Sequence, residues 1–507
     1  MATSAAHAQT VDLLVVGGGI NGAGIARDAA GRGLAVTLCE QGDLGGATSS
    51  ASSKLIHGGL RYLETYEFRL VREALIERER LLATAPHIIW PLDFILPHAG
   101  GLRPAWLVRL GLFLYDHLAS RRTLPGTRSI RLDRHPAGAA LKPGLRRAFV
   151  YADCWVEDAR LVVLNARDAA EHGARILTRT RLVHASRDAE AWSCDIVHSD
   201  GRPETVRAKA LVNAAGPWVT QLLDQAIGLN SAKQVRLIKG SHIVLPRLYE
   251  GPEAFILQND DRRIVFAIPY ERDYTLVGTT DVPFDADPSR VTIGADETRY
   301  LCDLVNKYFR RTVAPADVVW SYSGVRPLYD DAAAEARTVT RDYVLDLDAG
   351  AGRPALLSVF GGKITTSRRL AEHALEKLGP SLPGMRPAWT ATAPLPGGDM
   401  PGADFERFLA GFRRRFPFLP EPLALRLARA YGTRAERILG QAASLDDLGP
   451  DFGGGLTRSE VDYLVAEEWA RTADDILWRR SKLGLHVPEG TGAALDAVLG
   501  QHARAAE

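Results

Sequence analysis

Cysteine is scarce in this 507-residue sequence. The four cysteines lie far apart and form no C-x-x-C pair: Cys39, Cys154, Cys194 and Cys302. This spacing excludes the simple zinc and redox-disulfide sites, so we expect no bound metal. We interpret the four thiols as reduced side chains of the core, which is typical of a cytoplasmic protein.

Long apolar runs and excess charge of one sign are also absent. No run of 18 or more apolar residues occurs, so the sequence predicts no membrane-spanning helix. With a formal net charge of +1, the chain as a whole is not expected to bind nucleic acid or another polyanion. Residues 1–10 lack the basic start and apolar stretch of a secretory signal, and we interpret them as a disordered tail.

Length and patterning predict more than one domain. A chain of 507 residues, of which 46% are hydrophobic and 24% charged, is too long for one simple core. A βαβ opening followed by strand-rich stretches predicts an α/β region over residues 11–390, with insertions at about 84–150 and 230–345. Residues 391–402, rich in Pro and Gly, form a linker before a separate helical domain at 403–507.

Local patterns predict individual elements. Residues 64–83 are rich in Leu, Arg and Glu and predict a long helix. Four β-rich runs, at residues 234–246, 254–258, 263–269 and 274–279, are broken by turns such as Asp-Asp and Glu-Arg-Asp, as in an antiparallel meander. Two pairs, Thr457 with Glu460 and Thr472 with Asp475, each predict a capped helix start.

The strongest motif is a glycine-rich turn between the first predicted strand and helix. Residues 13–22 end in Gly17-Gly-Gly-Ile-Asn-Gly22, and Glu40 closes a second apolar run eighteen positions later. In such a turn Gly17 allows the tight bend, Gly19 lets backbone N–H groups approach a pyrophosphate, and Gly22 lets the helix pack on the strand. The helix N-terminus favours the phosphates, and Glu40 can accept two ribose hydroxyls, so the motif predicts a dinucleotide site.

Three further segments would complete a site for FAD. A hydroxyl-rich loop follows the second strand, the strand from Leu211 runs into a glycine, and the strand from Ser358 runs into a glycine pair and a helix start. Together with the first motif they favour FAD over NAD. The predicted cofactor contacts are Gly17, Gly19, Asn21, Gly22, Glu40, Thr48, Ser49, Ser50, Gly216, Gly361 and Gly362.

Longer strings give the chain a family resemblance. They are Gly17-Gly-Gly-Ile-Asn-Gly-Ala-Gly24, Ser52-Ser-Lys-Leu-Ile-His-Gly-Gly-Leu-Arg-Tyr-Leu63, Asp153-Cys-Trp-Val-Glu-Asp-Ala-Arg160, Lys239-Gly-Ser-His242, Tyr322-Ser-Gly-Val-Arg-Pro327, Thr340-Arg-Asp-Tyr343 and Phe360-Gly-Gly-Lys363. In order from about residue 11 to 380, these strings resemble the FAD-dependent, membrane-associated aerobic glycerol-3-phosphate dehydrogenases. One departure is Ala215 before Gly216, where flavoproteins often have Thr.

The resemblance implies a fold and an activity. The fold is α/β: a Rossmann-like FAD-binding domain of the glutathione-reductase or amino-acid-oxidase type, an inserted antiparallel-sheet substrate domain, and a C-terminal helical domain. The implied reaction takes sn-glycerol 3-phosphate to dihydroxyacetone phosphate and passes the electrons through FAD to a membrane quinone. A homodimer, attached peripherally to the cytoplasmic face of the cell membrane, is implied as well. Because the strings contain no evident flavin-linking residue, we expect FAD to be noncovalent.

The same strings contain side chains that suit this reaction. Four cations can bind the substrate phosphate, and two hydroxyls can assist them: Arg61, Arg326, Arg341, Lys363, Tyr62 and Thr279. The base that takes the hydroxyl proton is either His57 or His242, while Arg326 can instead polarise the substrate oxygen. The sequence does not choose between the two histidines.

Residues 103–118 predict the membrane contact. They combine Trp and large apolar residues with cations, and residues 101–150 hold ten Lys or Arg against two acids. An interfacial helix beside anionic lipid has this composition; a buried helix with a basic solvated face is the alternative. Three other functions compete with the predicted one: a glycerol-3-phosphate oxidase that uses dioxygen, an amine oxidase of the same fold, and a flavin-binding protein without activity.

Overall fold

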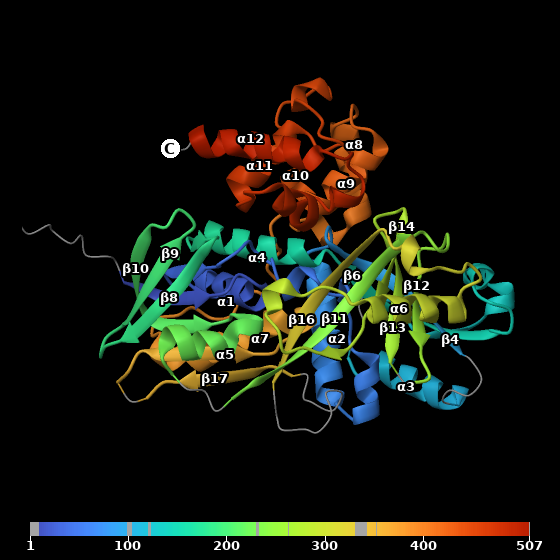
Figure 1. The fold of residues 1–507 in the computed structure, drawn as a ribbon, viewed down its shortest axis with the longest axis horizontal. Coiled ribbons are helices and arrows are strands. Elements are labelled where there is room, and N and C mark those ends of the chain that lie inside the picture. Colours follow the sequence, from blue (N-terminus) through green and yellow to red (C-terminus); the bar gives the residue numbers. More distant parts are fainter. Residues whose placement is uncertain are drawn as a thin grey trace, which may run out of the picture.

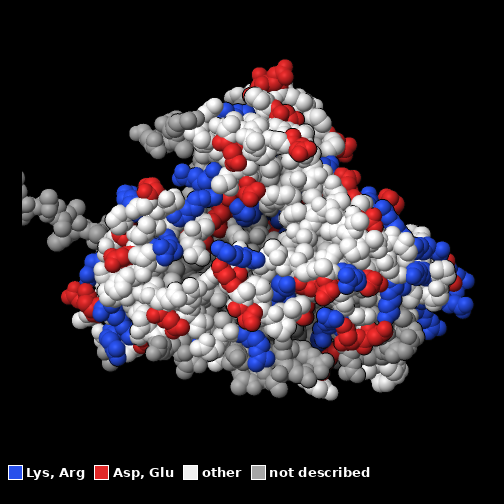
Figure 2. Space-filling model, viewed as in Figure 1, with Lys and Arg blue, Asp and Glu red and all other residues white. Residues whose placement is uncertain are grey.

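The computed structural model describes residues 10–98, 104–119, 123–229, 233–261, 263–329, 342–350 and 352–505. Arg341, predicted to bind phosphate, lies outside these ranges. Two β-sheets lie side by side, and a helical C-terminal domain covers them at one end (Figure 1). On the face drawn in Figure 2, Lys and Arg are interspersed with Asp and Glu, in keeping with the small net charge.

The first sheet is the nucleotide-binding half of the fold. Its main path is β17 (Val344–Asp348), β18 (Ala355–Phe360), β10 (Pro203–Asn213), β1 (Val11–Val16), β2 (Val36–Cys39) and β7 (Arg175–Leu177). The strands from β18 to β7 run parallel, while β17 is antiparallel to β18. A hairpin of β8 (Thr180–Arg187) and β9 (Trp192–His198) joins β10. The parallel order explains the continuous apolar runs of the central strands, since both of their faces are buried.

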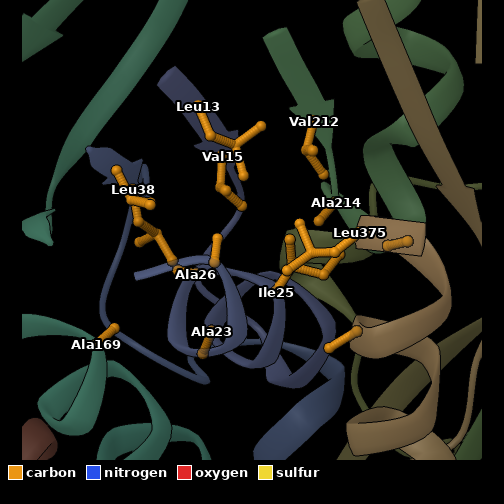
Figure 3. Close-up of a cluster of buried hydrophobic side chains, with 14 of the residues drawn as sticks. Leu13, Val15, Ala23, Ile25, Ala26, Leu38, Ala169, Val212, Ala214 and Leu375 are labelled. Atoms are coloured by element: carbon orange, nitrogen blue, oxygen red, sulfur yellow. The ribbon is translucent and has the colours of Figure 1, made fainter. Parts of the chain in front are cut away.

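Helices cover one face of this sheet: α1 (Ile20–Gly31), α4 (Asp158–Glu171) and α7 (Ser367–Leu378). In Figure 3, Leu13 and Val15 of β1 point toward Ala26 and Ile25 of α1, and Leu375 of α7 joins the same cluster. Small residues along α1 let it lie close to the strands. The other face packs against the β8–β9 hairpin and α5 (Val219–Leu222).

The second sheet takes most of its strands from the two predicted insertions, together with residues 55–56 and a strand that runs on to residue 156. Its order is β15 (Val282–Pro283), β11 (Val235–Pro246), β14 (Tyr274–Gly278), β13 (Ile264–Tyr270), β12 (Ala254–Gln258), β4 (Ile89–His98), β6 (Arg147–Val156) and β3 (Leu55–Ile56), with β16 (Trp320–Tyr329) on β11 and β5 (Arg128–Arg131) on β6. The predicted meander is confirmed for its last three strands, because β12, β13 and β14 pair antiparallel in sequence order. Its first strand, β11, pairs with β14 and β16 instead of with β12. The insertions join where β12 pairs with β4, and this pair is parallel.

Three helices cover the second sheet. α6 (Ala295–Tyr308) lies on one face, while α2 (Phe68–Thr84) and α3 (Ala105–His117) lie on the other. The helix predicted from residue 64 starts four residues later. Residues 60–65 form a 3₁₀ turn, and Tyr66 has a positive φ of 58°, which interrupts an α-helix.

The C-terminal helices have a core of their own. They are α8 (Phe405–Arg415), α9 (Glu421–Tyr431), α10 (Ala435–Leu439), α11 (Arg458–Glu468) and α12 (Thr491–Ala505). At one predicted helix start, Thr472 and Asp475 exchange side-chain to backbone hydrogen bonds of 3.2 and 3.0 Å. At the other, α11 begins directly after Thr457 as predicted, but the predicted capping contacts are absent. Thr457 makes no side-chain cap, and the Glu460 carboxylate is bound by Arg426.

Two expectations about absent features can be set against the structure. All four cysteines are free and buried in the described residues. Among the helices of the described ranges, none has the length and apolarity needed to cross a bilayer.

Candidate cofactor and substrate site

The turn between β1 and α1 leaves no room for side chains. Gly17 has a φ of +111°, and a Cβ there would lie less than 3.0 Å from the Ala214 carbonyl oxygen of the neighbouring strand end. A Cβ on Gly22 would likewise strike the Gly17 carbonyl oxygen. Gly19 is the N-cap of α1 and has no side chain, so a bound anion can approach the backbone N–H groups at the helix start, of which that of Ile20 is bonded to Ser49.

Glu40 stands directly after β2, beside this turn. Its carboxylate accepts hydrogen bonds from the backbone N–H groups of Gly18 (2.6 Å) and Gly42 (2.7 Å). Burial raises the pKa of Glu40, although both of these hydrogen bonds oppose the shift. Each carboxylate oxygen keeps a further lone pair, which a ribose hydroxyl can use. Gly18 is part of this arrangement and was missed from the sequence.

The hydroxyl-rich loop joins the turn to the second sheet. Ser49 Oγ accepts a hydrogen bond from Ile20 N–H (3.0 Å), at the first turn of α1. Thr48 Oγ1 donates to the Val325 carbonyl of β16 (2.6 Å), and Ser50 Oγ donates to the Ala47 carbonyl (3.3 Å). Thr48 therefore fixes the loop to the substrate sheet.

Two more glycine segments end strands at the same edge. Gly216, after β10, has a φ of +57°, while Gly361 and Gly362, after β18, have φ values of +73° and +101°. Asn21 Nδ2 donates to the Gly361 carbonyl (3.1 Å), and Asn21 Oδ1 is buried without a hydrogen-bond partner in the described part of the chain.

These segments fit a dinucleotide cofactor. The three strands β1, β10 and β18 run parallel, so their carboxyl ends, each followed by glycine, lie at one edge of the sheet. Ligands of doubly wound folds bind outside such edges. The glycine turn and the helix N-terminus suit the pyrophosphate of FAD. The Glu40 carboxylate suits its ribose, and the buried Asn21 oxygen, which has no hydrogen-bond partner in the described residues, suits one of its polar edges.

His242 lies on β11 of the second sheet, facing the hydroxyl-rich loop. Its ring stacks on Tyr322 of β16, with 4.8 Å between centroids and 16° between planes. Its Nε2 shares a hydrogen bond of 2.9 Å with Ser53 Oγ, while Nδ1 is buried without a partner in the described residues. Burial, with the charges of Lys54 and Arg326, lowers the pKa of His242 to about 3. The ring is therefore neutral at neutral pH.

Arg326 lies two residues beyond Gly324 on β16 and is already partly engaged. Its Nη1 forms an ion pair with Asp281 (2.7 Å), and its Nη2 donates to the Thr280 carbonyl (2.9 Å) and to Thr279 Oγ1 (3.3 Å). A Cβ on Gly240 of β11 would collide with the guanidinium. The glycine therefore makes the space in which Arg326 and Thr279 meet.

A second group of predicted residues lies around Lys363. Lys363 Nζ stands 3.9 Å above the Tyr62 ring centroid. His57 belongs to the same region, since its N–H donates to Thr365 Oγ1 (3.3 Å), and its Nδ1 accepts from Gly59 N–H (3.1 Å). In the described part of the chain, neither Lys363 nor Arg61 has a carboxylate partner.

The structure thus places the predicted substrate residues in two groups. One contains His242, Thr279 and Arg326, and the other contains His57, Tyr62 and Lys363, with Arg61 adjacent in sequence to Tyr62. Both groups adjoin residues 48–57, because Ser53 contacts His242 and His57 contacts Thr365. They also meet at the end of β16, where the Pro327 carbonyl lies beside Gly361.

The sequence reasoning missed a buried charged network next to this site. Lys54 Nζ donates to both oxygens of Asp158 (2.9 Å each) and to the Ser50 carbonyl (3.1 Å). Lys482 of the C-terminal domain donates to the same carboxylate (3.3 Å). Lys54 and Asp158 both occur in the strings that carry the family resemblance, which was the available signal.

Comparisons with known proteins agree with this geometry. Residues 12–368 match the FAD dependent oxidoreductase family, and residues 388–506 match the C-terminal domain of alpha-glycerophosphate oxidase. A glycerol-3-phosphate dehydrogenase of Pseudomonas aeruginosa is 57% identical over 98% of this chain and 96% of its own. A D-erythritol 1-phosphate dehydrogenase of Brucella abortus is 53% identical over 96% of this chain and 97% of its own.

A solved structure supports the fold. The glycerol-3-phosphate dehydrogenase of Bacillus halodurans in complex with FAD superposes with a TM-score of 0.75 and 27% identity, covering 94% of this chain and 86% of that one. This chain therefore belongs to the family of FAD-dependent glycerol-3-phosphate dehydrogenases and is a flavoenzyme with FAD as its cofactor.

Proposed function

We propose that this enzyme oxidises the secondary hydroxyl of sn-glycerol 3-phosphate and forms dihydroxyacetone phosphate. Bound FAD supplies the hydride acceptor. The observation that carries the proposal is Lys363, which directly follows the glycine pair at the cofactor edge and has no carboxylate partner in the described residues. Arg61, next in sequence to the Tyr62 ring that Lys363 contacts, has no carboxylate partner there either. A phosphate dianion needs several charge-assisted hydrogen bonds once it is desolvated, and unpaired cations provide them.

The other cations have different parts in this proposal. Arg326 is tied to Asp281 and Thr280, so it is held in place and keeps few free N–H groups. Such a fixed guanidinium suits the oxygen of the reacting carbon, where it stabilises developing negative charge with the Thr279 hydroxyl. Arg341 completes the phosphate site in our proposal, on the strength of the family string alone.

The two candidate bases are set up differently. His242 is neutral and has an unpartnered Nδ1, which is a ready acceptor for a hydroxyl proton, but burial makes the protonated ring costly. His57 is only half-buried and lies with the phosphate cations, but its Nδ1 accepts a backbone hydrogen bond. The pH dependence of kcat in His57→Gln and His242→Gln separates them. Only the variant of the base loses the acidic limb while keeping affinity for substrate.

We also propose that the electrons pass to a membrane quinone and that α3 is the membrane contact. Five apolar side chains of this helix are between 36% and 69% exposed and follow helical spacing: Trp106, Leu107, Leu110, Phe113 and Leu114. Tyr66 and Phe68, exposed by 79% and 39%, extend the patch. Trp and Leu beside exposed cations such as Arg109 are typical of helices that lie in a lipid interface.

Steady-state turnover tests the proposed reaction. The purified protein, supplied with sn-glycerol 3-phosphate and a soluble quinone analogue, should form dihydroxyacetone phosphate in a one-to-one ratio with reduced quinone. Formation of hydrogen peroxide in its place would identify dioxygen as the acceptor. No product with either acceptor would refute the proposed substrate.

A second substrate is favoured by one observation. The relative that is 53% identical is named for D-erythritol 1-phosphate, which carries one more carbinol carbon than glycerol 3-phosphate. The same phosphate cations serve either molecule. The ratio of kcat/KM values for the two phosphates decides between them, and we propose that glycerol 3-phosphate gives the higher value.

A further inference from the structure

A short segment of the C-terminal domain contacts one cofactor loop directly and a second loop through Asp158, the first residue of α4. It comprises the turn of π-helix η14 (Asp475–Arg480) and the two residues after it, Ser481 and Lys482. The loops belong to the first domain: residues 40–46 follow β2, and residues 48–54 follow shortly afterwards. The C-terminal domain lies over α4 (Figure 1). Arg480 reaches the first loop at Asp43, and Lys482 reaches Asp158 at the start of α4, which in turn binds Ser52 of the second loop.

The first contact is to Asp43. Arg480 donates to both carboxylate oxygens of Asp43, each at 2.8 Å, and Arg479 Nε donates to the second oxygen at 2.6 Å. Arg480 is 0% and Asp43 3% exposed at the side chain, so water does not replace this fork if it is broken. Asp43 is three residues from Glu40, and Gly45 N–H in the same loop donates to the Gly18 carbonyl (2.9 Å). The arginines therefore fix the loop that carries the ribose-binding acid.

The second contact is to Asp158. Lys482 Nζ donates to this carboxylate, which also accepts from Lys54 Nζ and from Ser52 Oγ (2.8 Å). Lys54 in turn holds the Ser50 carbonyl. The Asp158 side chain is 0% exposed, so neighbouring cations must balance its charge. Lys54 is one of these cations, and Lys482 is the one that the C-terminal domain supplies. Lys482 therefore completes the anchor of the hydroxyl-rich loop.

We propose that residues 479–482 form a clamp that holds the two cofactor loops in their FAD-binding arrangement, so that docking of the C-terminal domain and retention of FAD are coupled. One stretch of four residues thus fixes both loops, the first through Arg479 and Arg480 and the second through Lys482 and Asp158. Each loop also has a short path to the cofactor, through Glu40 in one case and Ser49 and Ser50 in the other. Loss of the clamp lowers the fraction of molecules in the binding arrangement, and the apparent affinity for FAD falls with it.

Coupling of this kind is reciprocal. If the clamp tightens FAD binding by some factor, bound FAD tightens docking of the clamp by the same factor. Hydrogen exchange of the amides of residues 471–485 should therefore be slower in the FAD-bound protein than in the flavin-free protein. A C-terminal domain that merely sits on the first domain would exchange at the same rate in both.

The experiment measures the rate of FAD release. Holoprotein is diluted, and the rise of flavin fluorescence is followed for wild type, Lys482→Met, Arg480→Met and Arg480→Lys. We expect release at least tenfold faster in the two Met variants and an intermediate rate in Arg480→Lys, which keeps the charge but loses the fork. The control is Arg434→Met, which breaks a different interface pair, with Glu171 (2.5 Å), that touches neither loop.

The outcomes separate a clamp from a merely structural contact. If Arg480→Met does not fold, Lys482→Met decides, because its contact is longer and less buried. Release within twofold of wild type in a folded Lys482→Met or Arg480→Met protein would overturn the proposal. So would an equal acceleration in Arg434→Met, because general weakening of the interface would then explain the effect. None of these readouts depends on the identity of the substrate.

Discussion

The substitution Lys363→Met tests the phosphate site most sharply. Methionine keeps the length of the side chain and removes the charge. Because Lys363 has no carboxylate partner in the described residues, its removal leaves no buried acid uncompensated. The folded protein loses the cation–π interaction between Lys363 Nζ and the Tyr62 ring, whose centroid lies 3.9 Å away. That interaction contributes roughly 0.5–2 kcal/mol, so the variant should fold normally.

The expected effect on catalysis is larger than the effect on stability. A charge-assisted contact to a desolvated phosphate oxygen contributes about 2–4 kcal/mol. This corresponds to a fall in kcat/KM for glycerol 3-phosphate of roughly 30- to 1,000-fold. Most of it should appear in KM, with some loss of kcat, since phosphate binding also positions the reacting carbon. Oxidation of glycerol, which lacks the phosphate, should be slow in both proteins and unchanged by the substitution.

Steady-state kinetics of Lys363→Met and of a matched control measure this. Lys307→Met is the control. Lys307 lies on α6, pairs with Asp260 (2.8 Å) and is not predicted to touch substrate. Efficiency of Lys363→Met within threefold of wild type would remove this residue from the phosphate site. An equal loss with glycerol would also refute the reasoning, because the lysine would then act on the reaction and not on the phosphate.

Three further predictions follow from other parts of the structure. Replacing Trp106 and Phe113 together by Ser should weaken binding to anionic vesicles by about 2 kcal/mol or more. The control Leu445→Ser alters an exposed leucine of the C-terminal domain and should leave vesicle binding unchanged. Equal cosedimentation of the two proteins with vesicles would rule α3 out as the contact. Gly19→Val should yield colourless protein that gains no flavin absorbance when FAD is added. The branched side chain would stand where the pyrophosphate approaches and would crowd Ser49. Retention of a full complement of FAD would show that the turn does not bind the cofactor. His87 is fully buried, and burial, with the charges of Arg160 and Arg429, lowers its pKa to about 3. In the unfolded chain the histidine has its ordinary pKa near 6.5, so below that pH it binds a proton that it does not bind in the folded chain. Stability is therefore lost as the pH falls from 6.5 toward 3, by roughly 2 kcal/mol at pH 5 for this residue, and His87→Gln should gain on wild type in thermal midpoint between pH 7 and pH 5; a constant difference between the two would contradict the shift.

The cofactor half of the site was predictable because its signals are local. Gly17, Gly19 and Gly22 lie within six residues, and Cβ atoms on Gly17 and Gly22 would collide with backbone oxygens. The meander from residue 254 to 279 was predictable for the same reason, since its turns lie in the chain between the strands they connect.

The charged network was not predictable, because its partners are distant in sequence. Lys54 and Asp158 are 104 residues apart, and Lys482 reaches Asp158 over 324 residues. No local pattern states which acid a lysine meets. The helix predicted after Thr457 does form, but its capping pair failed for a related reason: Glu460 has the right spacing, yet Arg426 binds its carboxylate across the domain.

Anaerobic reduction of the bound flavin tests the central claim most directly. The purified yellow protein is mixed with sn-glycerol 3-phosphate without oxygen or quinone, and the absorbance of the oxidised flavin is followed. The account predicts complete bleaching by glycerol 3-phosphate, far slower bleaching by glycerol, and none by glycine or proline. Bleaching by an amino acid in preference to glycerol 3-phosphate, or a flavin that glycerol 3-phosphate leaves oxidised, would contradict it.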